Sequence, residues 1–130
     1  MQITRFFETA DHGSCFEDLE IGFPDSKTDE FGYVLTLSRS CDANAMLAVL
    51  PANLDQDWHN APNRQFVCVL DGCLEVETSD GAVRRMARGD LFMADDTAGQ
   101  GHRTRVLDGR PVRLLFVRLA DDFDLAGWAA

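Results

Sequence analysis

Three Asp-Gly pairs, at 71–72, 80–81 and 108–109, divide the second half of the chain into short runs of residues. Asp-Gly favours tight turns between antiparallel strands, because glycine adopts the positive φ angles that such turns need. The runs between these pairs have the alternation of half-buried strands, as in 73–79, where Leu74 and Val76 are set against Cys73, Glu75 and Glu77. This pattern predicts antiparallel β-structure.

The same criteria predict strands along most of the chain, at 15–23, 32–39, 44–51, 64–70, 82–87, 89–94, 102–107 and 111–120. The run 44–51 is continuously apolar, which favours burial on both faces. The polar, proline-led stretch 24–32 is expected to be a loop, and only the tail after residue 120 has a helical pattern. Short strands at roughly ten-residue spacing predict an all-β sandwich or barrel.

Composition narrows the class of protein. A chain of 130 residues fits one domain that needs no disulfides. The four cysteines lack zinc spacing, so we expect reduced thiols at Cys15, Cys41, Cys68 and Cys73. No secretory signal or 18-residue apolar stretch is present, so we expect a cytoplasmic protein with no membrane partner. The net charge of −10 and the single lysine argue against binding to nucleic acid.

Two of the three histidines lie where predicted strands meet conspicuous turns. His59 precedes Ala61-Pro62, and His102 closes the glycine-containing loop 94–102, whereas His12 lies in a turn-like stretch. We expect the segments around His59 and His102 to face each other across the mouth of a barrel.

The stretch 57–72 resembles the first sequence motif of the cupin superfamily. Asp57-x-His59 stands where that family has His-x-His. Gln65 takes the position of the family's glutamate, since six residues separate it from the motif's closing glycine, Gly72. The gap between His59 and Gln65 is one residue longer than usual, and the leading glycine is absent.

The stretch 89–106 resembles the second cupin motif, with Gly89 at its start. Asp95-Asp96-Thr97 replaces the family's Pro-x-Gly, His102 comes two residues late, and Val106 stands where the family has asparagine. The resemblance covers 57–119 well and 1–50 loosely.

The resemblance implies an all-β fold, a cupin-type double-stranded β-helix (jelly-roll) barrel with extra N-terminal strands. Within one domain, we assign 1–50 to strands that pack on the barrel or exchange between barrels. Residues 51–120 then form the barrel core and 121–130 a C-terminal tail. The aliphatic final strand, 111–120, and the surplus N-terminal strands predict a homodimer that shares a sheet edge.

The family's metal site has three histidines and one glutamate. The equivalent positions here hold two imidazoles, one carboxylate and one neutral amide: His59, His102, Asp57 and Gln65. Such a set implies an optional site for one iron, manganese, nickel or zinc ion, because two histidines and one carboxylate suffice for a facial triad. Asp95 or Asp96 could supply the carboxylate in place of Asp57. Alternatively, the run Asp95-Asp96-Thr97 could order its loop through side-chain-to-backbone hydrogen bonds.

Strand alternation predicts the ligand-binding residues. Gln65 shares a strand face with Val67 and Val69, and Thr104 points with His102 while Arg103 and Arg105 point away. We therefore expect a small polar molecule to bind inside the barrel mouth, at Gln65, His59, His102 and Thr104. The alternative is a metal-dependent enzyme, such as a dioxygenase, isomerase or lyase with a small polar substrate. No Ser/His/Asp pattern or phosphate-binding loop points to another reaction.

Overall fold

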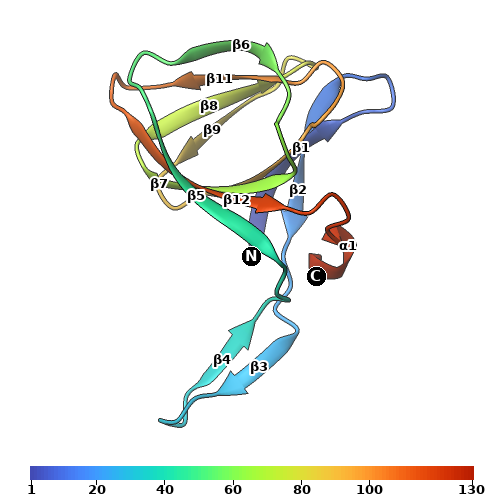
Figure 1. The fold of residues 1–130 in the computed structure, drawn as a ribbon, viewed down its shortest axis with the longest axis vertical. Helices are drawn as coiled ribbons and strands as arrows, with labels where there is room; N and C mark the ends of the chain where they lie inside the picture. Colours follow the sequence, from blue (N-terminus) through green and yellow to red (C-terminus); the bar gives the residue numbers. More distant parts are fainter.

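The computed structural model describes residues 1–130 and contains two large β-sheets (Figure 1). The first sheet has six strands in the order β2 (Ser14–Glu20), β1 (Gln2–Glu8), β10 (Leu91–Asp95), β7 (Gln65–Asp71), β12 (Val112–Leu119) and β5 (Ala43–Leu50). The second has four, in the order β6 (Asp55–His59), β11 (His102–Val106), β8 (Cys73–Thr78) and β9 (Val83–Ala87). All pairs are antiparallel except β1 with β10.

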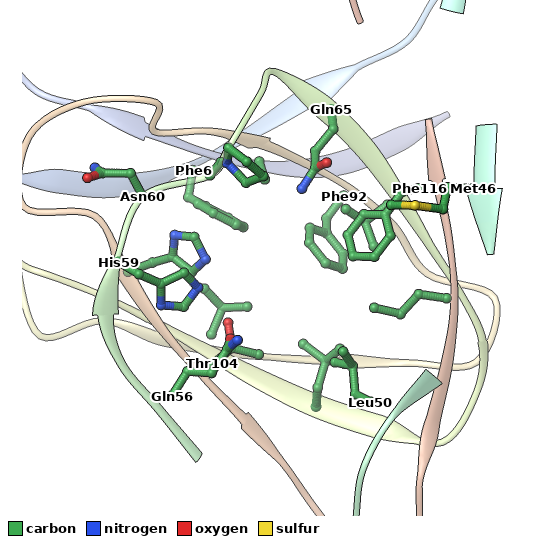
Figure 2. Close-up of a pocket in the computed structure, with 18 residues that line it drawn as sticks. Phe6, Met46, Leu50, Gln56, His59, Asn60, Gln65, Phe92, Thr104 and Phe116 are labelled. Carbon is green, nitrogen blue, oxygen red and sulfur yellow. The ribbon is translucent and has the colours of Figure 1, made fainter. Parts of the chain in front are cut away.

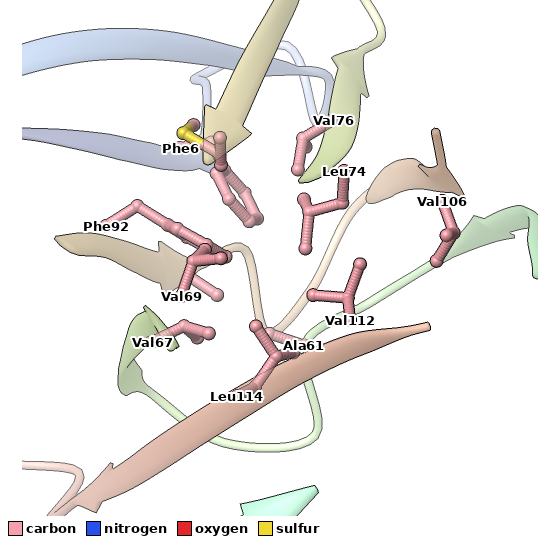
Figure 3. Packing of buried hydrophobic residues seen from close by; sticks show 12 residues of the cluster. Phe6, Ala61, Val67, Val69, Leu74, Val76, Phe92, Val106, Val112 and Leu114 are labelled. Carbon is pink, nitrogen blue, oxygen red and sulfur yellow. The ribbon is translucent and has the colours of Figure 1, made fainter. Parts of the chain in front are cut away.

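The two sheets face each other and bury one apolar cluster between them (Figure 3). Strand β7 illustrates why the sequence folds this way: Val67 and Val69 point into this cluster, and Phe66 points to the opposite face of the same sheet. The cluster contains residues from both sheets: Phe6, Ala61, Val67, Val69, Leu74, Val76, Met86, Phe92, Ala94, Val106, Val112 and Leu114. The predicted all-β fold is confirmed.

The tail covers the outer face of the six-stranded sheet. Phe123 and Trp128 pack on Phe66 with ring centroids 5.7 and 5.5 Å away. The helix expected after residue 120 is confirmed as one short turn, α1 (Leu125–Trp128). As the chain's single helix has four residues, no helix here is long enough to cross a membrane.

Two predictions about residues 24–51 are wrong. The expected loop 24–32 contains a strand, β3 (Asp25–Thr28), which pairs with β4 (Val34–Leu37) in a separate hairpin. The turn of this hairpin is held by Asp29, whose side chain accepts hydrogen bonds from the backbone N–H groups of Phe31 and Tyr33 at 2.9 and 3.0 Å. A polar strand that pairs only with its hairpin neighbour has no burial pattern by which the sequence could reveal it.

The second error concerns β5, which we expected to be buried on both faces. It lies at the edge of its sheet, paired on one side with β12, and most of its residues are exposed. The final strand, β12, is instead an interior strand between β7 and β5. The hairpin and the end of β5 extend away from the barrel in Figure 1.

The turn between β8 and β9 gives a prediction about pH. Asp80 accepts hydrogen bonds from the Thr78 hydroxyl at 2.6 Å and from the Ala82 N–H at 3.1 Å. These bonds lower the pKa of the Asp80 carboxyl below its usual 3.8, the hydroxyl contributing most. The ionised form therefore stabilises the fold above this value, and the stabilisation is lost as pH falls through the lowered pKa.

We expect Asp80→Asn to lower the free energy of unfolding at pH 7 by less than about 1 kcal/mol, because the carboxylate is exposed to solvent. The difference from the wild type should shrink in acid, as pH falls through the lowered pKa of Asp80 and its carboxylate takes up a proton. Urea unfolding at pH 7 and at a series of acidic pH values measures it. A difference that does not change with pH would show that the charge of Asp80 is irrelevant.

Candidate functional site

A cavity of about 330 Å³ lies inside the barrel between the two sheets (Figure 2). Eleven of its 18 lining residues are hydrophobic, and none is Asp, Glu, Lys or Arg. The apolar wall is formed by these eleven residues together with Pro62: Phe6, Met46, Leu50, Ala61, Val67, Leu74, Val76, Phe92, Ala94, Leu114 and Phe116. The polar side chains are Gln56, His59, Asn60, Gln65, His102 and Thr104. Figure 2 places His59, Gln56 and Thr104 on one side and Phe92, Phe116, Met46 and Leu50 on the other.

The two predicted histidines come together at the polar side of the cavity. His59 ends β6 and His102 begins β11, and the two residues are direct partners in the antiparallel pairing. Their ring centroids are 4.4 Å apart, and the His102 ring also packs on Phe6 at 4.7 Å. The two segments thus lie together as neighbouring strands of one sheet, rather than facing each other across the barrel mouth.

Hydrogen bonds fix the orientation of both imidazole rings. The Nδ1 atom of His59 lies 2.7 Å from the carbonyl oxygen of Asp57, and because a carbonyl oxygen only accepts, Nδ1 carries the proton. The Nδ1 atom of His102 lies 2.5 Å from the buried carboxylate of Asp96. Both rings thus use Nδ1 in the protein, which leaves Nε2 of each ring for a molecule in the cavity.

Asp96 is the polar residue behind this arrangement. Its side chain is fully buried, and its second oxygen lies 3.4 Å from the Ala61 N–H. Its backbone carbonyl accepts a hydrogen bond from the Asn60 side chain at 3.2 Å. Asp96 therefore ties β10, the segment after β6 and His102 together.

Gln65 and Thr104 lie in the wall of the same cavity, as strand alternation predicts. Gln65 begins β7 and is buried, and Thr104 lies on β11 two residues after His102. Arg103 and Arg105 point to the other side of β11, where Arg105 pairs with Glu75. All four ligand-binding candidates, Gln65, His59, His102 and Thr104, thus face one cavity.

Asp57 is not in the cavity. It is exposed, and its side chain accepts a hydrogen bond from the Trp58 N–H at 2.9 Å. The reason is an irregularity in the pairing of β6 with β11: His59 is opposite His102, but Gln56 is opposite Thr104. Two residues of β6 thus oppose one residue of β11, as in a β-bulge, which places Gln56 rather than Asp57 in the cavity wall.

Asp95 is also held away from the cavity. Its buried carboxylate pairs with two arginines, at 2.7 Å from Arg5 and 2.7 Å from Arg64. Arg64 also donates to the carbonyl oxygens of Asp121 and Phe123, both at 3.0 Å. Arg64 thus fastens the C-terminal tail to the barrel within one chain.

The donor set does not fit the metal site of the family resemblance. No group of three or more His, Cys, Asp or Glu side chains is arranged to hold a metal ion. The cavity offers two imidazole nitrogens and the neutral amides of Gln56, Gln65 and Asn60. Of the carboxylates considered, Asp57 lies outside, Asp95 is paired with arginines, and Asp96 is bound to His102. A divalent transition metal would lack the anionic ligand that the resemblance supplies.

Comparison with solved structures identifies the fold. The sequence matches no protein-family model. It also matches no curated protein. The cupin domain of Cnp3 from Schizosaccharomyces pombe superposes with a TM-score of 0.51 at 15% identity, covering 93% of this chain and 83% of that one.

Two bacterial structures are also similar. A Cupin 2 conserved barrel domain protein from Salinispora arenicola has a TM-score of 0.47 at 18% identity, over 64% of both chains. A cupin-2 domain containing protein from Shewanella frigidimarina has a TM-score of 0.47 at 12% identity, over 76% of this chain and 83% of that one. The two facing sheets, the central cavity and the overlap with the Cnp3 domain establish that this chain has the cupin fold.

Proposed function

We propose that this protein binds a small uncharged molecule inside its barrel, and that the polar end of this molecule meets the two histidines. The cavity carries this proposal. It is large enough for a small ring compound, its wall is mostly apolar, and Gln56 and Thr104 lie on the same side of it as His59 (Figure 2). Such a combination of apolar walls and a few convergent polar groups is typical of small-molecule sites.

The lining favours a particular class of ligand. An ionised ligand would enter a cavity without a countercharge, which is unfavourable in an apolar environment. The aromatic rings of Phe6, Phe92 and Phe116 favour an apolar or aromatic body. Hydroxyl or amide groups on the ligand can donate to the free Nε2 atoms of His59 and His102. A neutral cyclic alcohol, phenol or amide meets these requirements better than a fully polar molecule.

Binding without a metal is favoured over the metal-dependent alternative. The donors in the cavity include no carboxylate, and the buried Asp96 serves His102. The hydrogen bond from Nδ1–H of His102 to the Asp96 carboxylate orients the ring and makes its Nε2 atom a better hydrogen-bond acceptor. A ligand hydroxyl can donate to this Nε2 atom without a metal between them.

The neutral fluorescent probe N-phenyl-1-naphthylamine tests the proposal. We expect its fluorescence to rise when it enters the wild-type cavity, and phenol or cyclohexanol to displace it. Gln56→Trp should weaken binding at least about tenfold, because the indole fills space at the cavity wall. Asp57→Trp is the matched control, because Asp57 is the next residue of β6 and does not line the cavity.

Equal probe binding by the two variants would contradict binding inside the barrel. So would a wild-type protein that gives no fluorescence rise with this probe and no change in melting temperature with the neutral ring compounds. Circular dichroism of both variants serves as the folding control, because each substitution introduces the same side chain at adjacent positions of β6.

A further inference from the structure

The exposed apolar side chains of this protein are concentrated in one region. Eight of the twelve exposed large hydrophobic residues lie on the β3–β4 hairpin or on β5: Phe31, Tyr33, Val34, Leu35, Leu37, Met46, Leu47 and Val49. Together they expose on the order of 1,000 Å² of side-chain surface. We call these eight residues the apolar patch.

The edge strands of the two sheets differ in a way that singles out β5. Three of them carry charges that discourage pairing with another chain, a common protection of sheet edges. These charges are Glu17, Asp18 and Glu20 on β2, Asp55 and Asp57 on β6, and Arg84 and Arg85 on β9. Strand β5, with the sequence ANAMLAVL, has none. It is thus an eight-residue edge without charged residues, mostly apolar, with unpaired backbone groups.

We propose that β5 and the β3–β4 hairpin form the surface on which a second copy of this chain docks. A two-fold axis beside the middle of β5 would pair the strand antiparallel with its own copy and join two six-stranded sheets into one. The apolar patch exceeds the roughly 800 Å² that each partner buries in an interface of standard size. The hairpin needs such cover, since a two-stranded sheet on its own is only marginally stable in water.

Charge favours a second copy over a charged partner. The chain carries a net charge of −10, so two copies repel each other over most of their surface. The β5 edge is free of charged residues and is therefore the face on which this repulsion is least direct. The sequence predicts a homodimer that uses the final strand, but β12 lies in the interior of the sheet. We therefore propose that the dimer forms at the edge strand β5.

The register of β5 separates Leu47 and Val49 from the cavity, whereas Met46 belongs both to the apolar patch and to the cavity wall. Met46 is opposite Phe116 and lines the cavity, whereas Leu47 is opposite Leu115 on the other face of the sheet. Leu47 and Val49 are 72% and 65% exposed and are absent from the cavity wall. Substitutions at these two positions therefore address the docking surface without altering the cavity, and the proposal stands independently of the proposed function.

Molar mass from light scattering and sedimentation tests the proposal. We expect the wild type at about 20 µM to have twice the 14.5 kDa mass of one chain. Leu47→Lys combined with Val49→Lys should raise the dissociation constant of the dimer at least about 100-fold, because the apolar contacts are lost and like charges meet across the axis. The lysines reduce the net negative charge, so general repulsion between copies cannot explain dissociation.

Val83→Lys is the matched control, because Val83 is an exposed apolar residue on the charged edge strand β9. It should leave the dimer intact. Phe31→Asn combined with Tyr33→Asn should weaken the dimer at least about tenfold through loss of the hairpin contacts.

Hydrogen exchange provides a second measurement that needs no variant. The amides of β5 that face away from β12 should be protected in concentrated wild-type protein and exchange faster on dilution. A wild type that stays at 14.5 kDa up to about 200 µM would overturn the proposal. A dimer that survives the β5 substitutions, or that dissociates equally with Val83→Lys, would also overturn it.

Discussion

Replacing Gly101 with alanine should lower the free energy of unfolding by about 3–5 kcal/mol and abolish probe binding. Gly101 precedes His102 and has a φ of 77°, which an L-residue adopts only with strain. A Cβ atom at this position would lie 2.1 Å from the carbonyl oxygen of His59 and 2.5 Å from its carbon. These are backbone atoms, so β6 would have to move away from β11.

This close approach sets the geometry of the candidate site. Only a glycine at position 101 lets the backbone of β6 come near enough for the His59 and His102 rings to lie 4.4 Å apart. The carbonyl oxygen of Gly101 also accepts a hydrogen bond from the Ser14 hydroxyl at 2.6 Å, which ties the loop to β2. The substitution should therefore affect binding as well as stability.

Gly81→Ala is the matched control for this prediction. Gly81 has a similar φ of 87°, but a Cβ there would meet nothing within 4 Å. It should cost only about 1 kcal/mol, the backbone term alone, and leave probe binding unchanged. Urea unfolding of both variants measures the difference, and equal losses of stability would show that the contact with His59 does not matter.

Replacing Asp96 with alanine should lower the free energy of unfolding by about 2–4 kcal/mol. The substitution leaves the buried Nδ1–H of His102 without a hydrogen-bond acceptor. It also removes the carboxylate oxygen that lies near the Ala61 N–H. Free to rotate, the His102 ring should present Nε2 to the cavity only part of the time, so we also expect weaker binding of phenol.

Two further variants separate position from charge. Asp96→Asn keeps an oxygen that accepts from His102 Nδ1, so it should retain more of the stability and of the phenol binding than Asp96→Ala. Asp57→Ala removes an exposed carboxylate whose bond is to the neighbouring backbone, and it should change stability by less than about 0.5 kcal/mol. If Asp96→Ala and Asp57→Ala behaved alike, Asp96 would have no role in positioning His102.

Much of the cavity wall could be predicted from strand alternation. Gln65 and Thr104 lie on regular strands, where the two-residue period fixes which side chains face inward. The glycines of the Asp-Gly pairs have positive φ at 72, 81 and 109, but only the pair at 80–81 joins two paired strands, β8 and β9. The other two pairs connect strands that lie in different sheets, which local turn rules do not distinguish.

The errors have identifiable physical causes. Asp57 and Gln56 exchange places because a bulge interrupts the period of β6, and nothing in the sequence DQDWH marks it. Strand β5 is mostly apolar and yet exposed. An apolar run in a sequence does not reveal whether its side chains pack in the core of the same chain or against another chain. The tie between Asp96 and His102 depends on how the loop between them folds back, which spacing alone does not specify.

Nuclear magnetic resonance with a panel of neutral ring compounds tests the central claim most directly. At least one alcohol, phenol or amide of the panel should shift the side-chain amide signals of Gln56 and Gln65 and the methyl signals of Thr104 and Met46. The methyl signals of Val83, on the far edge of the second sheet, should stay unchanged. If no compound moved the four cavity signals, or if the shifts gathered outside the barrel, a binding site between the two sheets would be contradicted.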